Sequence, residues 1–99
     1  MIEYTVLYVK IKVISIRTGV EIMKLDLYMF PSCPYCRRVL AVMDSQGRKD
    51  ITLHNIHANE QDRKTLIRVG GKEQVPCLFI DGTPMYESQD IIDWLVHHP

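Results

Sequence analysis

Two cysteines two residues apart, Cys33 and Cys36 within the run CPYC, carry the most reactive side chains of this 99-residue sequence. A thiolate attacks disulfides, and a second thiol close by can resolve the mixed disulfide that forms. If the pair opens a helix, backbone N–H groups of the first turn stabilise the Cys33 thiolate, and Arg37 and Arg38 add positive charge nearby. We therefore expect thiol–disulfide exchange, with an exposed Cys33 as nucleophile and a less exposed Cys36 as resolving thiol.

Metal binding and a purely structural role are the alternatives for this pair. A zinc site normally takes four Cys or His ligands, and a single CxxC would have to borrow Cys77 or one of the four histidines. The sequence has no second pair at ligand spacing, and we expect His54 and His57 to line a surface or cap a loop. Cys77 follows a proline in an apolar run and is expected in the core. No metal is therefore expected.

The local pattern predicts a strand before the cysteine pair and a helix after it. Residues 25–30 (LDLYMF) form an apolar run typical of a buried strand. Pro34 suits the first position of a helix, because the N–H that proline lacks has no helical partner there. Apolar residues then recur at helical spacing up to Gly47, the expected helix end. The pair thus lies where a helix begins.

The rest of residues 25–99 alternates strands and helices. Asn59 is a candidate N-cap for a second helix, Asp81-Gly82 is a hairpin turn, and Ser88 is the expected N-cap of a last amphipathic helix. The remaining strands are expected at 51–56, 77–80 and 83–86. The order β-α-β-α-β-β-α, with one parallel crossover and one hairpin, predicts a mixed four-stranded sheet in a thioredoxin-like, three-layer α/β sandwich.

Composition narrows the range of partners and compartments. Twelve basic and twelve acidic residues balance, which gives no reason to expect nucleic acid or an anionic membrane as partner. Charges interrupt every apolar run, so neither a transmembrane helix nor a secretion signal is expected. Three cysteines are an odd and small number, which fits a reducing, cytoplasmic setting. A cytoplasmic monomer of one domain is the expectation.

Residues 1–24 form an N-terminal extension outside this plan. Apolar and polar side chains alternate between positions 4 and 13 as in a strand, while Met23 lies where a start would be expected. An extra strand and a disordered product of upstream initiation are the two interpretations.

The combination of CPYC after a strand, Val75-Pro76 before a strand, a DG hairpin and a serine at the start of the last helix resembles the glutaredoxins. The resemblance covers about residues 25–97 and implies a disulfide oxidoreductase that uses glutathione as co-substrate and disulfide-containing proteins as partners. By the same resemblance, the Val75-Pro76 bond should be cis and face Cys33.

The resemblance also implies which residues bind glutathione. The Val75 backbone would pair with the tripeptide's cysteine beside Pro76, and Tyr35 would contact its glycine end. Ser88 and nearby N–H groups would hold the γ-glutamyl carboxylate, because helix N-termini bind anions. Glu87 would meet the ammonium group of the tripeptide.

Two departures from the glutaredoxin pattern are visible. Many members carry a lysine three positions before the first cysteine and a Gly-Gly pair after the hairpin, where this chain has Phe30 and Tyr86-Glu87. The Glu87-Ser88 step looks more like the thioredoxin-fold domain of glutathione transferases. The alternatives to an oxidoreductase are a module that binds an iron–sulfur cluster between two chains, and an electron donor reduced by thioredoxin reductase.

Overall fold

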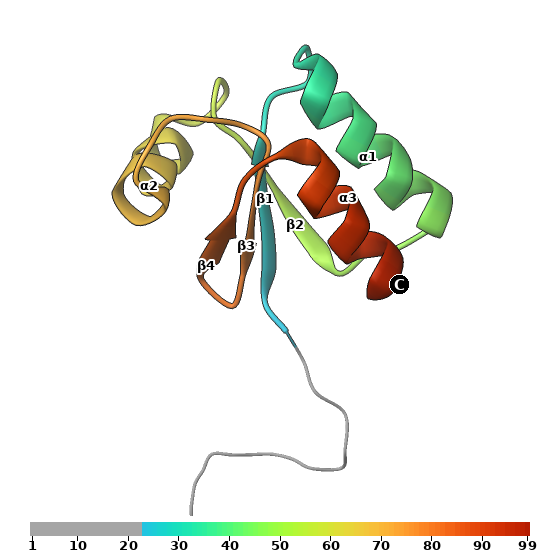
Figure 1. Cartoon of the computed structure of the whole chain (residues 1–99). Helices are drawn as coiled ribbons and strands as arrows, with labels where there is room; N and C mark the ends of the chain where they lie inside the picture. The colour runs from blue at the N-terminus through green and yellow to red at the C-terminus, as the bar shows by residue number, and fades with distance from the viewer. Residues whose placement is uncertain (1–22) are drawn as a thin grey trace, which may run out of the picture.

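The computed structural model describes residues 23–99, which form one α/β unit (Figure 1). The possible extra strand at 4–13 lies outside these residues. The elements follow the predicted order: β1 (Leu25–Met29), α1 (Pro34–Gln46), β2 (Ile51–Asn55), α2 (Glu60–Gly70), β3 (Cys77–Ile80), β4 (Thr83–Met85) and α3 (Ser88–His97).

The four strands form one mixed sheet in the order β2-β1-β3-β4. β1 pairs with β2 in parallel and with β3 in antiparallel, and β4 completes the hairpin with β3. Both turn residues, Asp81 and Gly82, have positive φ, which matches the twist of a two-residue hairpin. The predicted ends of β1, β2 and β4 were each one residue too long, because Phe30, Ile56 and Tyr86 already belong to the connections.

Helices cover both faces of the sheet, as Figure 1 shows: α1 and α3 lie together on one side and α2 lies on the other. β1 is buried along its whole length. Successive side chains of a strand point to opposite faces, so Leu27 packs in the cluster with Val39 and Leu95, whereas Tyr28 packs with Leu66 of α2. This is the predicted three-layer sandwich.

A polar network joins α2 to the face of the sheet that α2 covers. Asp26 on β1 is nearly buried and accepts hydrogen bonds from Lys24 Nζ and His54 Nε2, each at 2.8 Å. The other ring nitrogen of His54 lies 3.1 Å from Asp62 Oδ1 in the first turn of α2, and the ring stacks on Tyr28. The expectation that His54 lines a surface or caps a loop was therefore wrong, because its ring bridges the carboxylates of Asp26 and Asp62 between the sheet and α2.

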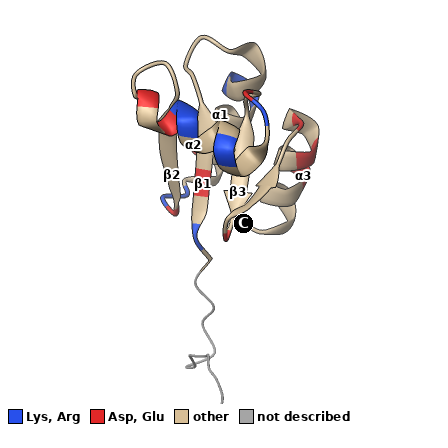
Figure 2. Cartoon of the chain, turned by 90° about the vertical axis from the view of Figure 1, so that its left-hand side faces the viewer, with Lys and Arg blue, Asp and Glu red and all other residues tan. Residues whose placement is uncertain are grey.

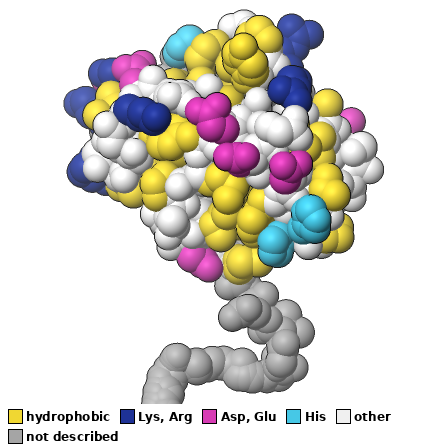
Figure 3. Space-filling model, viewed as in Figure 1, with side chains coloured by type: hydrophobic (Ala, Val, Ile, Leu, Met, Phe, Trp, Pro, Cys, Tyr) yellow, Lys and Arg dark blue, Asp and Glu magenta, His cyan; other side chains and the backbone are white. Residues whose placement is uncertain are grey.

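Charge is spread over the molecule in small groups. Figure 2, which colours the ribbon by residue type, shows acidic residues at one end of α2 and basic residues further along it; Glu60 and Asp62 lie in the first turn and Arg68 in the last. This arrangement complements the helix dipole. Figure 3 shows an acidic group on the middle of one face, with basic side chains at its edges. No helix of residues 23–99 is long and apolar enough to cross a membrane.

Candidate active site

Cys33 is the N-cap of α1, and its sulfur takes part in the capping. The Cys33 Sγ atom accepts a hydrogen bond from the backbone N–H of Cys36 at 3.3 Å. Pro34 occupies the start of the helix, as predicted. The sulfur thus lies at the positive end of the helix dipole with one donor directed at it, an arrangement that stabilises negative charge on sulfur.

Cys33 is more enclosed than the sequence suggested. Cys36 is fully buried, as expected, but only 6% of Cys33 is exposed, so the prediction of an exposed first sulfur was wrong. The reason is packing: Cys33 belongs to the core cluster between the sheet and the helices α1 and α3. Burial, followed by the hydrogen bond with Cys33, raises the pKa of the Cys36 thiol. Burial also raises the pKa of Cys77, a core residue as predicted, to about 11.

These differences predict selective alkylation. With limiting iodoacetamide at pH 8, Cys36 and Cys77 stay protonated because their pKa values are raised, and a thiol reacts far more slowly than a thiolate. We expect one adduct, located at Cys33 by peptide mass spectrometry. The matched control is the same reaction in denaturant, where all three thiols should react. First modification at Cys36 or Cys77 would contradict the assignment.

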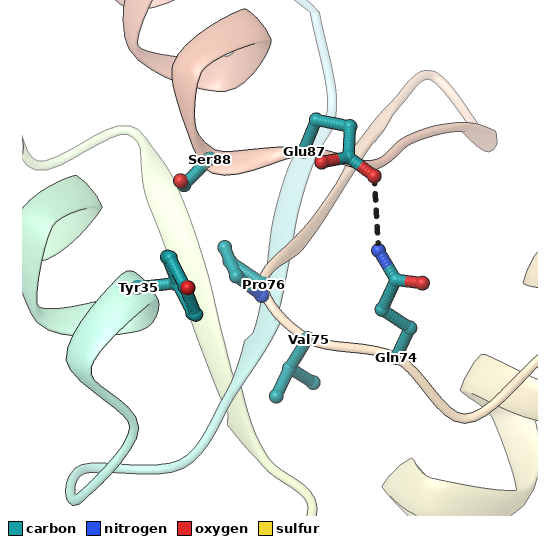
Figure 4. A pocket seen from close by; sticks show the side chains of 6 residues that line it. All are labelled: Tyr35, Gln74, Val75, Pro76, Glu87 and Ser88. Carbon is teal, nitrogen blue, oxygen red and sulfur yellow. Dashed lines mark hydrogen bonds between the residues drawn. The ribbon is translucent and has the colours of Figure 1, made fainter.

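A cavity of about 300 Å³ opens beside the start of α1. It is lined by Tyr35, Gln74, Val75, Pro76, Glu87 and Ser88 (Figure 4). The five residues predicted from the resemblance to bind glutathione thus come together from three separate segments of the chain. Gln74 is the lining residue that sequence reasoning missed, and its position directly before Val75-Pro76 was the available signal.

The segment before β3 forms one wall of this cavity. The Val75-Pro76 peptide bond is cis, as the resemblance implied. Val75 packs against both core clusters, one of which contains Cys33, but Cys33 itself is not among the residues that line the cavity. In Figure 4, Tyr35 at the start of α1 lies across from Pro76. The loop at 74–76 and the first turn of α1 therefore form two sides of the cavity.

The start of α3 forms the third side. Glu87, and not Ser88 as predicted, is the N-cap: its φ is +69°, it makes no side-chain capping bond, and Ser88 is the first helical residue. The left-handed backbone at Glu87 turns the chain into the helix, which leaves its carboxylate free to accept a 3.4 Å hydrogen bond from Gln74 Nε2. The hydroxyl of the preceding residue, Tyr86, donates to the Lys72 carbonyl at 3.1 Å.

Residues 23–99 contain no group of three or more His, Cys, Asp or Glu side chains arranged to hold a metal ion. His57 stacks on Phe30, the residue that stands where many glutaredoxins carry lysine, with ring centroids 4.0 Å apart.

Comparison with known proteins assigns the chain to a family. The glutaredoxin family model matches residues 25–85. The chain belongs to the glutaredoxin family. Glutaredoxin 3 of Escherichia coli strain K12 is 35% identical over 66 residues, which are 67% of this chain and 78% of that protein. This glutaredoxin is therefore a thiol–disulfide oxidoreductase.

Solved structures agree with the fold of this glutaredoxin. The thioredoxin-like protein BC3987 superposes with a TM-score of 0.63 at 22% identity, over 75% of this chain and 96% of that one. The dithiolic glutaredoxin of Trypanosoma brucei brucei gives 0.59 at 27% identity, over 76% and 79%. Glutathione transferase Omega 3C of Trametes versicolor gives 0.62 at 25% identity, over 76% of this chain and 33% of that one.

Proposed function

We propose that this glutaredoxin reduces glutathione mixed disulfides and protein disulfides with glutathione as co-substrate. The observation that carries the proposal is the cavity at the first turn of α1, the helix whose N-cap is Cys33; its lining includes Tyr35, Val75, Pro76, Glu87 and Ser88. Its size and mixed lining suit a tripeptide with charged ends. The protein would act as a monomer in the reducing environment of the cytoplasm, where its cysteines would stay reduced between turnovers.

The reaction proceeds in two exchange steps. The Cys33 thiolate attacks the glutathione sulfur of a mixed disulfide, a Cys33–glutathione disulfide forms, and the substrate thiol leaves. A second glutathione thiolate then attacks the glutathione sulfur bound to Cys33 and releases glutathione disulfide, so that two electrons pass from glutathione to the substrate. Cys36 can instead attack Cys33, but its raised pKa leaves little thiolate at neutral pH. We therefore expect glutathione, rather than Cys36, to resolve the intermediate on this substrate.

The start of α3 supports binding of the γ-glutamyl end. α1 and α2 have side-chain caps, whereas α3 has none, so its first-turn N–H groups are available to a ligand carboxylate. Glu87 places a carboxylate on the same side of the cavity, where it can accept from the ligand's ammonium group. The carboxylate of the γ-glutamyl residue would thus bind the N–H groups of α3, and its ammonium group would bind Glu87.

The test compares two mixed disulfides of one reporter peptide, made with glutathione and with cysteinylglycine, which lacks the γ-glutamyl residue. We expect kcat/KM to be at least about tenfold higher with glutathione, since a charge-assisted hydrogen bond contributes about 1.5–3 kcal/mol. Glu87→Gln should lower this preference by about three- to tenfold.

Asp90→Asn is the matched control for Glu87→Gln. Asp90 lies in the first turn of α3, is exposed and does not line the cavity, so its loss removes one charge from the same helix end. The preference for glutathione should survive in Asp90→Asn. Equal rates with both mixed disulfides in the wild type would refute glutathione binding in this cavity.

A further inference from the structure

The guanidinium of Arg38 connects α1 to the start of α3. Arg38 Nη1 donates to Ser88 Oγ at 3.3 Å, and Nη2 donates to Gln89 Oε1 at 2.9 Å. α1 and α3 lie side by side on the same face of the sheet (Figure 1), so this contact spans the two helices whose first turns border the cavity. Sequence reasoning treated Arg38 only as a charge near Cys33.

This contact decides which way the Ser88 hydroxyl points. A guanidinium has only donors, so the Ser88 oxygen must accept from Arg38 and its hydrogen must point elsewhere. Ser88 is 8% exposed and lines the cavity, and no acceptor among the described residues takes its hydrogen. The side chain is thus a buried donor that is free to bind a ligand in the cavity.

The position of Arg38 is itself maintained by α3. Gln89 Nε2 donates to Asp93 Oδ1 at 3.0 Å, which orients the amide so that its oxygen faces Arg38. Arg38 therefore donates on two sides, to Ser88 directly and to Gln89, which in turn donates to the Asp93 carboxylate. A lysine could not reproduce it, because one ammonium lacks the fork that contacts two acceptors in a fixed geometry.

The distribution of charge around the start of α3 also favours the binding of an anionic group there. The six lining residues include Glu87 but no lysine or arginine. Arg38 supplies positive charge one hydrogen bond away from the lining, where it adds to the dipole of α3. Glu87 and Arg38 thus give the two ends of this wall opposite charge.

We propose that Arg38 is a positioning and specificity-determining residue, which makes Ser88 a hydrogen-bond donor and thereby selects ligands that carry the γ-glutamyl α-carboxylate. The inference rests on the proposed binding of glutathione in this cavity. It adds Arg38, which does not line the cavity, and assigns this residue the recognition of the α-carboxylate, one of the two charged groups at the γ-glutamyl end.

The experiment uses three mixed disulfides of one reporter peptide. The first carries glutathione, the second carries 4-aminobutyryl-cysteinylglycine, which lacks only the α-carboxylate, and the third carries glutaryl-cysteinylglycine, which lacks only the ammonium group. In Arg38→Gln, we expect the ratio of kcat/KM for glutathione over the 4-aminobutyryl analogue to fall by about three- to tenfold. The ratio over the glutaryl analogue should stay as in the wild type, and Glu87→Gln should show the reverse pattern.

Two further variants separate position from charge. Arg37→Gln removes the same charge from the adjacent residue of α1 but leaves the hydrogen bond from Arg38 to Ser88 in place, and should preserve the carboxylate ratio. Arg38→Lys retains the charge but not the paired contact, and should lose part of that ratio. A fall of equal size in Arg37→Gln would overturn the positioning role.

The outcomes distinguish this inference from the proposed function. If the wild type prefers glutathione over neither analogue, glutathione is not bound as proposed and both statements fail. If the wild type discriminates by the carboxylate and Arg38→Gln does so equally, the function stands and the role of Arg38 is wrong. A parallel loss of both ratios, with a lower melting temperature, would assign Arg38 a merely structural contact and overturn the inference.

Discussion

Replacing Cys33 by serine should abolish disulfide reduction, with kcat/KM lowered by more than about a thousandfold. Cys33 caps α1, and the N–H of Cys36 is directed at its sulfur, which makes it the cysteine best placed to react as a thiolate. A serine hydroxyl at the same place does not ionise near neutral pH and cannot form a disulfide. The measurement is glutathione-coupled reduction of a small mixed disulfide.

Cys36→Ser is the informative companion to this variant. Because burial raises the pKa of Cys36, we expect glutathione to resolve the intermediate, and Cys36→Ser should keep a substantial part of the rate on a glutathione mixed disulfide. Reduction of a protein disulfide that needs both cysteines should fall much further. The opposite result, an inactive Cys36→Ser beside an active Cys33→Ser, would exchange the two roles.

Cys77→Ala controls for the loss of any one thiol. Cys77 is fully buried in the cluster that faces α2, away from the cluster that contains Cys33. We expect its removal to lower stability slightly through a small cavity and to leave kcat/KM near the wild-type value. A large loss of activity in a folded Cys77→Ala protein would show that the third thiol takes part in the chemistry.

The largest effect on stability is expected for Leu27→Ala. Leu27 is fully buried on β1, between β2 and β3, in the cluster that packs against α1 and α3. The substitution removes buried methyl groups and leaves a cavity, which costs about 2–5 kcal/mol of the free energy of unfolding. For a domain of this size the melting temperature should fall by more than about 10 °C. Urea and thermal unfolding followed by circular dichroism measure both quantities.

Leu53→Ala provides the matched control. Leu53 is the partner of Leu27 in the parallel register of β1 and β2, but half of it is exposed on the outer strand. The same chemical change should therefore cost less than about 1 kcal/mol. Equal destabilisation by the two substitutions would mean that Leu53 is covered, contrary to the description of β2 as an exposed edge.

Local patterns carried most of the fold prediction. Gly47 ends α1 in the left-handed conformation, and the Asn59 side chain accepts from the first-turn N–H groups of α2, both as expected. Asp81-Gly82 likewise forms the predicted hairpin. These features depend on a few neighbouring residues, so the chain sequence suffices to predict them.

The start of α3 shows where local reasoning failed. Serine is a favoured N-cap, which made Ser88 the natural choice, yet the cap is Glu87. The decision comes from contacts distant in sequence: Tyr86 packs beside Gly70, where any Cβ would clash with its hydroxyl, and bonds to the Lys72 carbonyl. These contacts set the path of the chain into α3.

The sequence alone determined the reactive group and the order of the elements, because a CPYC run at a helix start and the periodicity of apolar residues act through neighbours along the chain. Tertiary structure decided the rest. It buried Cys33, added Gln74 to the cavity and brought Arg38 to Ser88 across 50 residues. These outcomes depend on how the helices pack over the sheet. That packing involves side chains from segments far apart in the chain, so no single stretch of sequence predicts it.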